Sequence, residues 1–315
     1  MTRLKNLAAW VLALGLVIPS NSFAEPLFAV WLDGCTETNS VPNVCPNGGT
    51  GGNGIPFSLD EEFPGSVTLV TTAQLETPGF LNGFDAVVIS RFDNTFGTAL
   101  STGAVTNIQT YVGTGPNQGG VATFTNDAAD SLCDPVKFSC PTGGDPFDAN
   151  LNQLFQNSAA LVAATHHGYI GELNGAIMAF SSNSSGFLPA IGLLPGSSTG
   201  VQQVQQTVPP TGFKYVVGPI GAGHPIDAGI TFPFETRELT LFLGTVTNAD
   251  SGNVVDEYGN HGLEGVPAIV ANAAAIGGVV PPPQVPEPAS LVLFGLGLAG
   301  LAAWKRGRRS RSRDC

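Results

Sequence analysis

Phe84-Asp-Ala-Val-Val-Ile-Ser90 is a short apolar run centred on Val-Val-Ile, which is the pattern of a buried β-strand. The next segment, residues 99–112, has apolar side chains at helical spacing. A second short strand is expected at Gly120-Val-Ala-Thr-Phe-Thr125, directly after this helix. A strand, a helix and a strand in succession predict an α/β layered domain in which helices flank a mostly parallel sheet.

The same alternation extends in both directions from this unit. Further strands are expected at residues 26–32, 66–72, 161–165, 213–217 and 238–244, and further helices at residues 150–160 and 170–180. Long loops rich in Gly and Asn separate these elements, as at residues 35–54. The abundance of Gly, Thr and Asn leaves an all-β sandwich as the alternative fold class.

The first 24 residues have the anatomy of a secretory signal peptide. Two basic residues precede an apolar stretch over residues 7–18, and Ser22-Phe23-Ala24 offers small residues at positions −3 and −1 of a cleavage site. We therefore expect cleavage of residues 1–24 after Ala24, so that residues 25–276 form the exported body. An uncleaved anchor is the alternative.

The C-terminal region carries a second targeting pattern. Val285-Pro286-Glu287-Pro288 is followed by an apolar run without charges, residues 289–304, and then by a basic cluster. The run is slightly shorter than the roughly 20 residues that a helix needs to cross a bilayer, and the basic cluster would stay on the cytoplasmic side. An ordinary membrane anchor and a buried core helix are the alternatives.

This order of Pro-Glu-Pro box, hydrophobic segment and basic cluster resembles the PEP-CTERM sorting signal of Gram-negative bacteria. The resemblance implies an exported substrate of an exosortase, a membrane transpeptidase-like enzyme. It implies a transient stay in the inner membrane through residues 289–315, then release to the cell surface or beyond, in company with exopolysaccharide. The Val- and Pro-rich residues 277–288 are expected to form an extended linker that ends in the sorting box.

Charge sets the exported body apart from its two ends. Residues 25–285 contain four basic and 22 acidic residues, a formal net charge of −18. Such a surface repels nucleic acid and anionic membranes, so nucleic acid is not expected as a partner. Two acidic segments could hold Ca²⁺, although solvated loops are the simpler interpretation. They are Asp127, Asp130 and Asp134, and Asp250, Asp256 and Glu257.

Cysteine spacing fits an oxidising compartment. Cys35 and Cys45 bracket one short Pro-containing loop, and Cys133 and Cys140 bracket another. We therefore expect two disulfides, Cys35–Cys45 and Cys133–Cys140. The spacing differs from that of zinc-binding Cys-x-x-Cys pairs, and Cys315 is expected to leave with the sorting tail.

The best candidate for a site is Thr165-His166-His167-Gly168, between the expected strand at residues 161–165 and the expected helix at residues 170–180. A sharp turn from strand to helix lifts a side chain above the helix N-terminus. The stretch resembles the nucleophile elbow of the class I glutamine amidotransferase-like superfamily, where the strand ends in Ala-Ala-Ile-Cys-His-Gly. The stretch that begins at His224-Pro225 also resembles a His-Pro stretch of those domains.

His166 occupies the position of that family's cysteine, so the resemblance implies a relative without the thiol chemistry, or one rebuilt around histidine. The candidate catalytic residues are His166, His167, Glu172 and His224. Histidine and carboxylate ligands suit Zn²⁺, but adjacent His166 and His167 cannot both point the same way from a strand. Ordinary loop or core histidines, His261 among them, are the simpler interpretation.

Three functions stay open from the sequence. The favoured one is a non-enzymatic surface or extracellular-matrix protein that works among exopolysaccharides. The second is a periplasmic or surface metal-dependent hydrolase that uses the His and Glu cluster. The third is a module that binds a small ligand or sugar in a crevice at the top of the sheet. Whether the chain is an enzyme is therefore undecided, and the candidate cofactors are Ca²⁺ and Zn²⁺.

Overall fold

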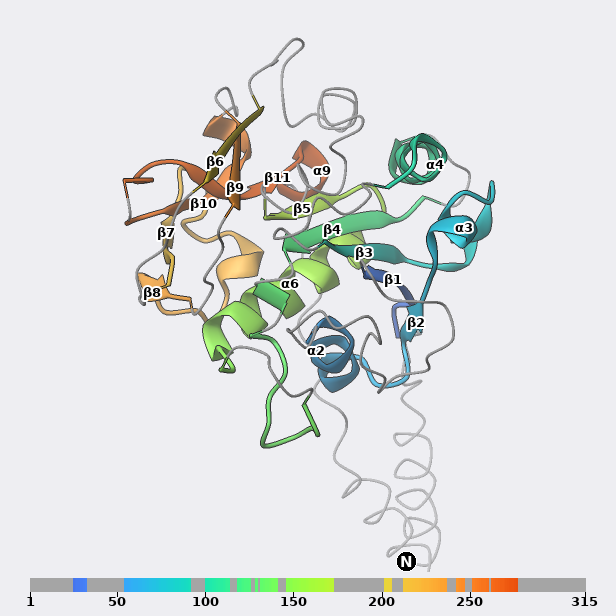
Figure 1. Ribbon diagram of the computed structural model, residues 1–315, viewed down its shortest axis with the longest axis horizontal. Coiled ribbons are helices and arrows are strands. Elements are labelled where there is room, and N and C mark those ends of the chain that lie inside the picture. The colour runs from blue at the N-terminus through green and yellow to red at the C-terminus, as the bar shows by residue number, and fades with distance from the viewer. Residues whose placement is uncertain are drawn as a thin grey trace, which may run out of the picture. The chain divides into compact units, whose positions relative to one another are not determined.

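Nine strands form one sheet in the computed structural model (Figure 1). In spatial order they are β2 (Val67–Leu69), β1 (Phe28–Leu32), β3 (Ala86–Arg91), β4 (Gly120–Thr125), β5 (Tyr169–Glu172), β11 (Pro267–Ala271), β10 (Val254–Tyr258), β7 (Lys214–Val217) and β8 (Phe234–Glu235). A separate two-stranded antiparallel sheet pairs β6 (Val201–Gln205) with β9 (Phe242–Val246).

The structure describes several separate parts of the chain. They are residues 25–32, 54–91, 100–113, 118–125, 128–129, 131–140, 146–172, 201–205, 212–236, 242–246, 251–260 and 262–276. The chain divides into two compact units, Met1–Val280 and Pro281–Cys315, and all described residues belong to the first. The predicted signal peptide, linker and sorting tail lie outside the described residues.

The sheet consists of a parallel half and an antiparallel half. β2, β1, β3, β4 and β5 all run parallel to their neighbours. From β5 onward each pair is antiparallel, through β11, β10, β7 and β8. The α/β prediction therefore holds, while "mostly parallel" describes only the first five strands. In this half, β10 and β11 are joined by the short connection at residues 259–266, which antiparallel neighbours allow.

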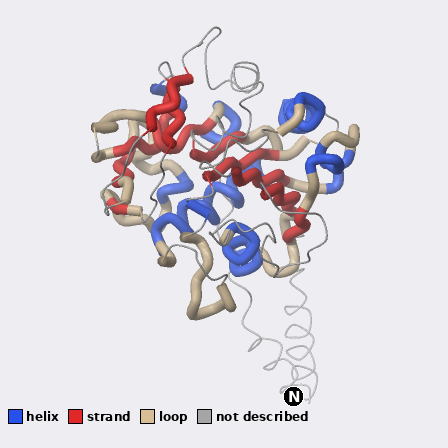
Figure 2. Tube along the Cα trace, viewed as in Figure 1, coloured by secondary structure: helices blue, strands red, loops and turns tan. Residues whose placement is uncertain are grey.

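Helices cover both faces of the parallel half, which rules against the all-β alternative (Figures 1 and 2). One face packs against α2 (Ile55–Glu62) and α6 (Ala149–Thr165), and the small α9 (Ala273–Ile276) joins them. The other face packs against α3 (Thr72–Leu75) and α4 (Thr102–Gly113), with a 3₁₀ turn, η1 (Phe80–Gly83), beside them.

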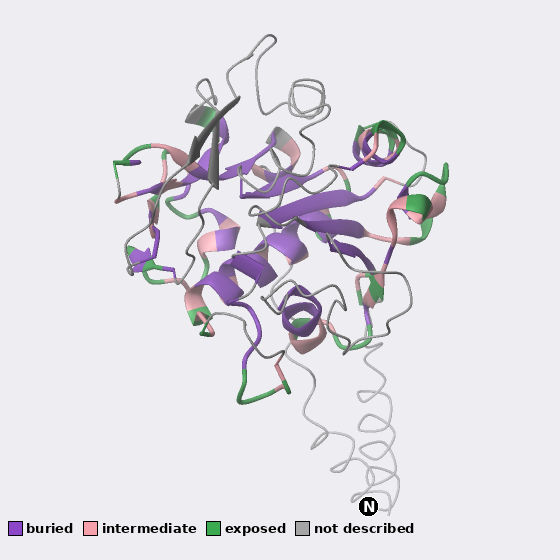
Figure 3. Cartoon of the chain, in the orientation of Figure 1, coloured by how far each residue is buried: buried purple, intermediate pink, exposed green. Residues whose placement is uncertain are grey.

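Burial on both faces explains why the central strands are apolar along their whole length. Every residue of β1 is buried, and the β3 residues from Ala86 to Ser90 are buried as well (Figure 3). Such unbroken apolar runs are typical of parallel strands between two helical layers. Across the α6 interface, Phe124 of β4 meets Phe155 edge-on with ring centroids 5.0 Å apart. Such a pair contributes about 0.5–1.5 kcal/mol beyond the area that it buries.

Helix α6 corrects the predicted elements around the two histidines. Its first turn is capped by Asp148, whose carboxylate accepts hydrogen bonds from two backbone N–H groups. The helix then continues through residues 161–165, which were expected to be a strand. Residues 170–172, expected to begin a helix, belong to β5 (Tyr169–Glu172) instead. The apolar positions of residues 161–163 continue the buried face of α6, so helical packing onto β4 decides their structure.

His166 ends α6 in the left-handed conformation, with φ of 56°. We predict that His166→Gly raises the free energy of unfolding by about 0.5–1 kcal/mol, because glycine adopts this conformation without steric cost. Ala164→Gly is the matched control, since Ala164 is also exposed but lies within the helix. That control should lose about 0.5–1 kcal/mol. Urea midpoints measure both, and destabilisation by His166→Gly would contradict the capping role.

Candidate functional site

The predicted elbow residues lie at opposite ends of β5. His166 and His167 precede the strand, whereas Glu172 is its last residue. Because β5 rises about 3.3 Å per residue, its length alone separates the two ends by roughly 10 Å. The order helix, turn, strand is also the reverse of a nucleophile elbow. The amidotransferase-like interpretation of this stretch is therefore wrong.

The structure shows the surroundings of each of these three side chains. His166 is exposed, and Nδ1 of His167 lies 2.9 Å from the carbonyl oxygen of Val112. Glu172 is buried, and its carboxylate accepts a hydrogen bond from the hydroxyl of Tyr215 at 2.8 Å. These contacts tie α6 to α4 and β5 to β7, so they hold the fold together.

The predicted zinc cluster does not form. Across the described ranges, no three His, Cys, Asp or Glu residues come together as a group that could hold a metal ion. His224 is buried on the loop before β8, and the reversed order of helix and strand around β5 keeps His166 apart from Glu172. His261 lies outside the described residues.

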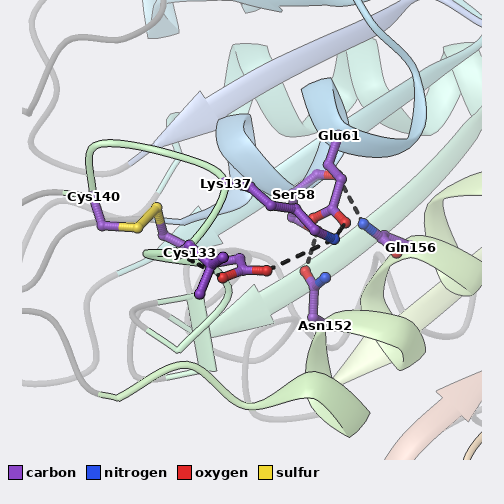
Figure 4. A network of polar contacts seen from close by, with 9 residues as sticks. Ser58, Glu61, Cys133, Lys137, Cys140, Asn152 and Gln156 are labelled. Atoms are coloured by element: carbon purple, nitrogen blue, oxygen red, sulfur yellow. Dashed lines mark hydrogen bonds and ion pairs between the residues drawn. A yellow bond between two sulfur atoms is a disulfide. The ribbon is translucent and has the colours of Figure 1, made fainter.

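The first predicted acidic segment is engaged in the fold at the one position that the structure describes. Oδ1 of Asp134 accepts a hydrogen bond from the backbone N–H of Val136, and Oδ2 lies 3.7 Å from Nζ of Lys137. Lys137 also pairs with Glu61 of α2 (Figure 4). Asp127 and Asp130, like Asp250 of the second segment, lie outside the described residues. The Asp134 carboxylate, with its hydrogen bond and its nearby lysine, is therefore not a free cation ligand.

The disulfide Cys133–Cys140 closes the same loop, as predicted from the spacing (Figure 4). Cys35 and Cys45 lie outside the described residues, so their pairing remains a prediction. Deeper in the fold, the hydroxyl of Ser58 donates to Asn152 at 2.5 Å, which joins α2 to α6. Figure 4 thus shows polar contacts and a disulfide that link α2 to α6 and to the loop at residues 133–140.

The second predicted acidic segment contains an unexpected feature, a carboxylate in the core. Asp256 lies within β10 and is 0 % exposed. Opposite β11, Val254 pairs with Val270 and Asp256 pairs with Ile269, so Val255 is an extra residue in β10. Such a bulge re-aims the side chains of the strand that carries it. Glu257, next in the chain, is only half-buried.

A second carboxylate approaches Asp256 from the loop between β7 and β8. Asp227 is the last residue of a 3₁₀ turn, η2 (Pro225–Asp227), which Asn157 of α6 holds by donating to the carbonyl oxygens of Ile226 and Ala228 at 2.7 and 2.9 Å. The negative charge of Asp227 acts on Asp256, so the two groups form an interacting pair.

Gly221 makes this approach sterically feasible. A Cβ atom at Gly221 would lie 2.3 Å from the carbonyl oxygen of Val255 and 3.0 Å from Oδ2 of Asp227. Any side chain at residue 221 would therefore collide with β10 and press on the Asp227 carboxylate. The backbone turn at residues 218–221 is held against β10 by hydrogen bonds from Gly218 and Ile220 to the strand's carbonyl oxygens.

The polar atoms of this acid pair lack partners. All four carboxylate oxygens of Asp227 and Asp256 are buried and have no hydrogen-bond partner among the described residues. Nε2 of His224, the residue that caps η2, is likewise buried and unpartnered. Buried polar groups are nearly always satisfied, so the four unpartnered carboxylate oxygens of this pair point to a missing partner.

Burial and mutual repulsion shift the pKa of these groups strongly. Burial raises the pKa of Asp227 to about 7. Burial, together with the nearby Asp227 charge, raises the pKa of Asp256 to about 9. Burial lowers the pKa of His224 to about 4. The chain alone therefore disfavours two ionised carboxylates here, as in other closely spaced acid pairs.

The sequence identified His224 and Asp256 for separate reasons and did not connect Asp227 with Asp256. One signal was available, because Asp256 stands in Val-Val-Asp-Glu-Tyr, where a strand pattern surrounds a charged residue. The partner could not be identified in this way, since it comes from a distant loop.

Comparison with known proteins identifies the C-terminal end of the chain. Residues 284–309 match the PEP-CTERM protein-sorting motif. No curated protein and no solved structure matches the chain. The chain is therefore a protein with a PEP-CTERM sorting signal, and its body gains no support for an amidotransferase-like relationship.

The motif implies export, recognition by an exosortase and transient membrane anchoring before processing. Within the described residues, no helix combines the length and apolar character that a bilayer crossing requires. The predicted membrane segment, residues 289–304, lies outside those residues.

We predict that, in the presence of a chelator, the melting temperature falls as the pH rises from 6.5 to 9. A carboxyl whose pKa is higher in the folded protein than its unfolded value of 3.8 contributes its full stability only below that unfolded value. This stability is lost as the pH rises through the folded pKa, which is about 7 for Asp227 and about 9 for Asp256. His224, with its pKa lowered to about 4, acts only below pH 6.5.

Asp256→Asn should flatten this decline, and the adjacent Glu257→Gln should keep it. Calorimetry of the wild type, Asp256→Asn and Glu257→Gln between pH 6.5 and 9 measures the decline in melting temperature. Equal slopes in all three would show that the pair does not titrate as described.

Proposed function

We propose that the chain is an exported, non-enzymatic surface or matrix protein, which an exosortase releases among exopolysaccharides. The observation that carries this proposal is the PEP-CTERM motif at residues 284–309. The formal charge of −18 on residues 25–285 supports it, because a strongly charged body stays soluble and avoids anionic membranes.

The surroundings of the predicted catalytic residues also favour a non-enzymatic body. His166 caps a helix, His167 contacts a backbone carbonyl, and Glu172 accepts a hydrogen bond from a buried tyrosine. Side chains engaged in this way stabilise the fold and lack the convergent geometry that a general acid, base or metal ligand needs.

We predict that the released protein begins at Glu25 and lacks residues 289–315. Intact mass spectrometry of the protein from the producing cells measures both ends. Replacement of Pro286, Glu287 and Pro288 by Ala should leave the body folded, because these residues lie outside Met1–Val280, and should retain the tail. A wild-type mass that includes residues 289–315 would contradict processing, and an unchanged mass in the variant would contradict the role of the box.

A second candidate function, binding of a small ligand or sugar, is favoured by the strand order. The chain passes from β1 to β2 on one side and then to β3 on the other side of β1. In open parallel sheets, ligands bind at such a reversal, in the crevice beyond the carboxyl ends of the strands. Hydroxyl groups lie at the first turns of α3 and α4, the helices that follow β2 and β3. Thr71 caps α3, and Ser101 accepts a hydrogen bond from Ala104 in the first turn of α4.

We predict that oligosaccharides from the producer's exopolysaccharide slow hydrogen exchange at the first turns of α3 and α4. The amides of β10 and β11 should stay unchanged, since they lie far along the sheet from β1. Asp256→Asn serves as a control and should show the same protection. Protection elsewhere, or none, would exclude a sugar site at the strand reversal.

A further inference from the structure

We propose that Asp227 and Asp256 form a Ca²⁺-binding site that links the loop before β8 to the antiparallel half of the sheet. The proposal goes beyond the sorting function and does not depend on it. It rests on two buried carboxylates whose four oxygens have no partner among the described residues.

Without a counter-charge, the two carboxylates cannot both ionise at this site. Burial of one carboxylate without a partner is costly, and a second carboxylate beside it adds repulsion. Proteins satisfy such groups with hydrogen bonds, a basic side chain or a metal ion. Among the described residues, neither a hydrogen-bond donor nor a basic group compensates the pair. A divalent cation would neutralise both charges at once.

The donor atoms select the kind of cation. The pair offers only oxygen ligands, and no third His, Cys, Asp or Glu in the described ranges joins it as a metal ligand. Zn²⁺ in proteins favours nitrogen and sulfur donors in a tetrahedral set. Ca²⁺ accepts carboxylates, main-chain carbonyls and water in flexible geometry, whereas Mg²⁺ demands a near-ideal octahedron. Backbone carbonyls and water would complete the shell of a Ca²⁺ ion.

Local contacts hold the strand and the turn that carry Asp256 and Asp227. The β-bulge at Val255 carries Asp256, and hydrogen bonds from Asn157 fix the turn that carries Asp227. Gly221 leaves the space between the strand and the Asp227 carboxylate free of any side chain. The backbone segments that carry the two carboxylates are therefore held before any ion binds.

An ion can reach this site although a larger substrate cannot. Asp256 is fully buried, so an organic substrate has no access to its carboxylate. Asp227 is half-buried, and the neighbouring residues 222–223 and 228–229 are exposed. This loop is therefore the side from which a small cation would enter. The site is therefore one for structural ion binding rather than for acid–base catalysis.

The test uses the purified exported protein, stripped with a chelator, at neutral pH. We expect Ca²⁺ at about 100 times its dissociation constant to raise the melting temperature by roughly 5–10 °C. Isothermal titration should give one Ca²⁺ ion per chain, and Mg²⁺ at the same concentration should give a smaller shift.

Asp256→Asn and Asp227→Asn should each abolish the Ca²⁺ shift. Asp256→Asn should fold in the chelator with a melting temperature no lower than that of the wild type, because the amide has nearly the same shape as the buried carboxyl and carries no charge. Glu257→Gln removes a neighbouring carboxylate and should keep the full shift.

Three results would overturn the site: no Ca²⁺ shift in the wild type, an undiminished shift in Asp256→Asn, or loss of the shift in Glu257→Gln. The sorting function has its own readout, the mass of the released protein, so either idea can fail without the other.

Discussion

Burial of the parallel strands between two helical layers is the constraint on which the rest of the structure depends. β1, β3 and β4 have almost no solvent exposure, so their backbone groups must pair within the sheet and their side chains must pack on both faces. Helix α6 supplies much of one face, and its position is fixed by aromatic contact with β4 and by polar contacts with α2. The loop that carries Asp227 packs on the same helix, so the acid pair depends on this layer as well.

The antiparallel half extends this sheet and contains its main electrostatic conflict. A sheet buried on both faces has little tolerance for charge, yet β10 places Asp256 inside it. The β-bulge at Val255 reorients the side chains of β10, and Gly221 leaves room for the loop that carries Asp227. Both features allow Asp256 and Asp227 to come together. Features that sacrifice local stability in this way are typical of functional positions. A bound Ca²⁺ ion would neutralise the two carboxylates and link the loop that carries Asp227 to β10.

The sorting signal and the body have separate physical tasks. The tail consists of a box, an apolar run and a basic cluster, which act through their order along the chain. The body carries nearly all of the acidic residues and all of the described residues. This separation explains why the destination of the protein can be identified although its body matches no known protein.

Local patterns in the sequence were sufficient for the C-terminal sorting signal, the Cys133–Cys140 pairing and the strand, helix and strand of β3, α4 and β4. They failed at residues 161–172, because a five-residue apolar run fits either a buried strand or the end of a buried helix. They also failed to connect Asp227 with Asp256. Hydrophobic periodicity and residue spacing carry information about a single element. The sequence by itself therefore determined the elements with a clear hydrophobic period and the sorting signal. Contacts between elements distant in the chain decided the length of α6, the antiparallel half and the burial of the acid pair, because those depend on which surfaces pack together.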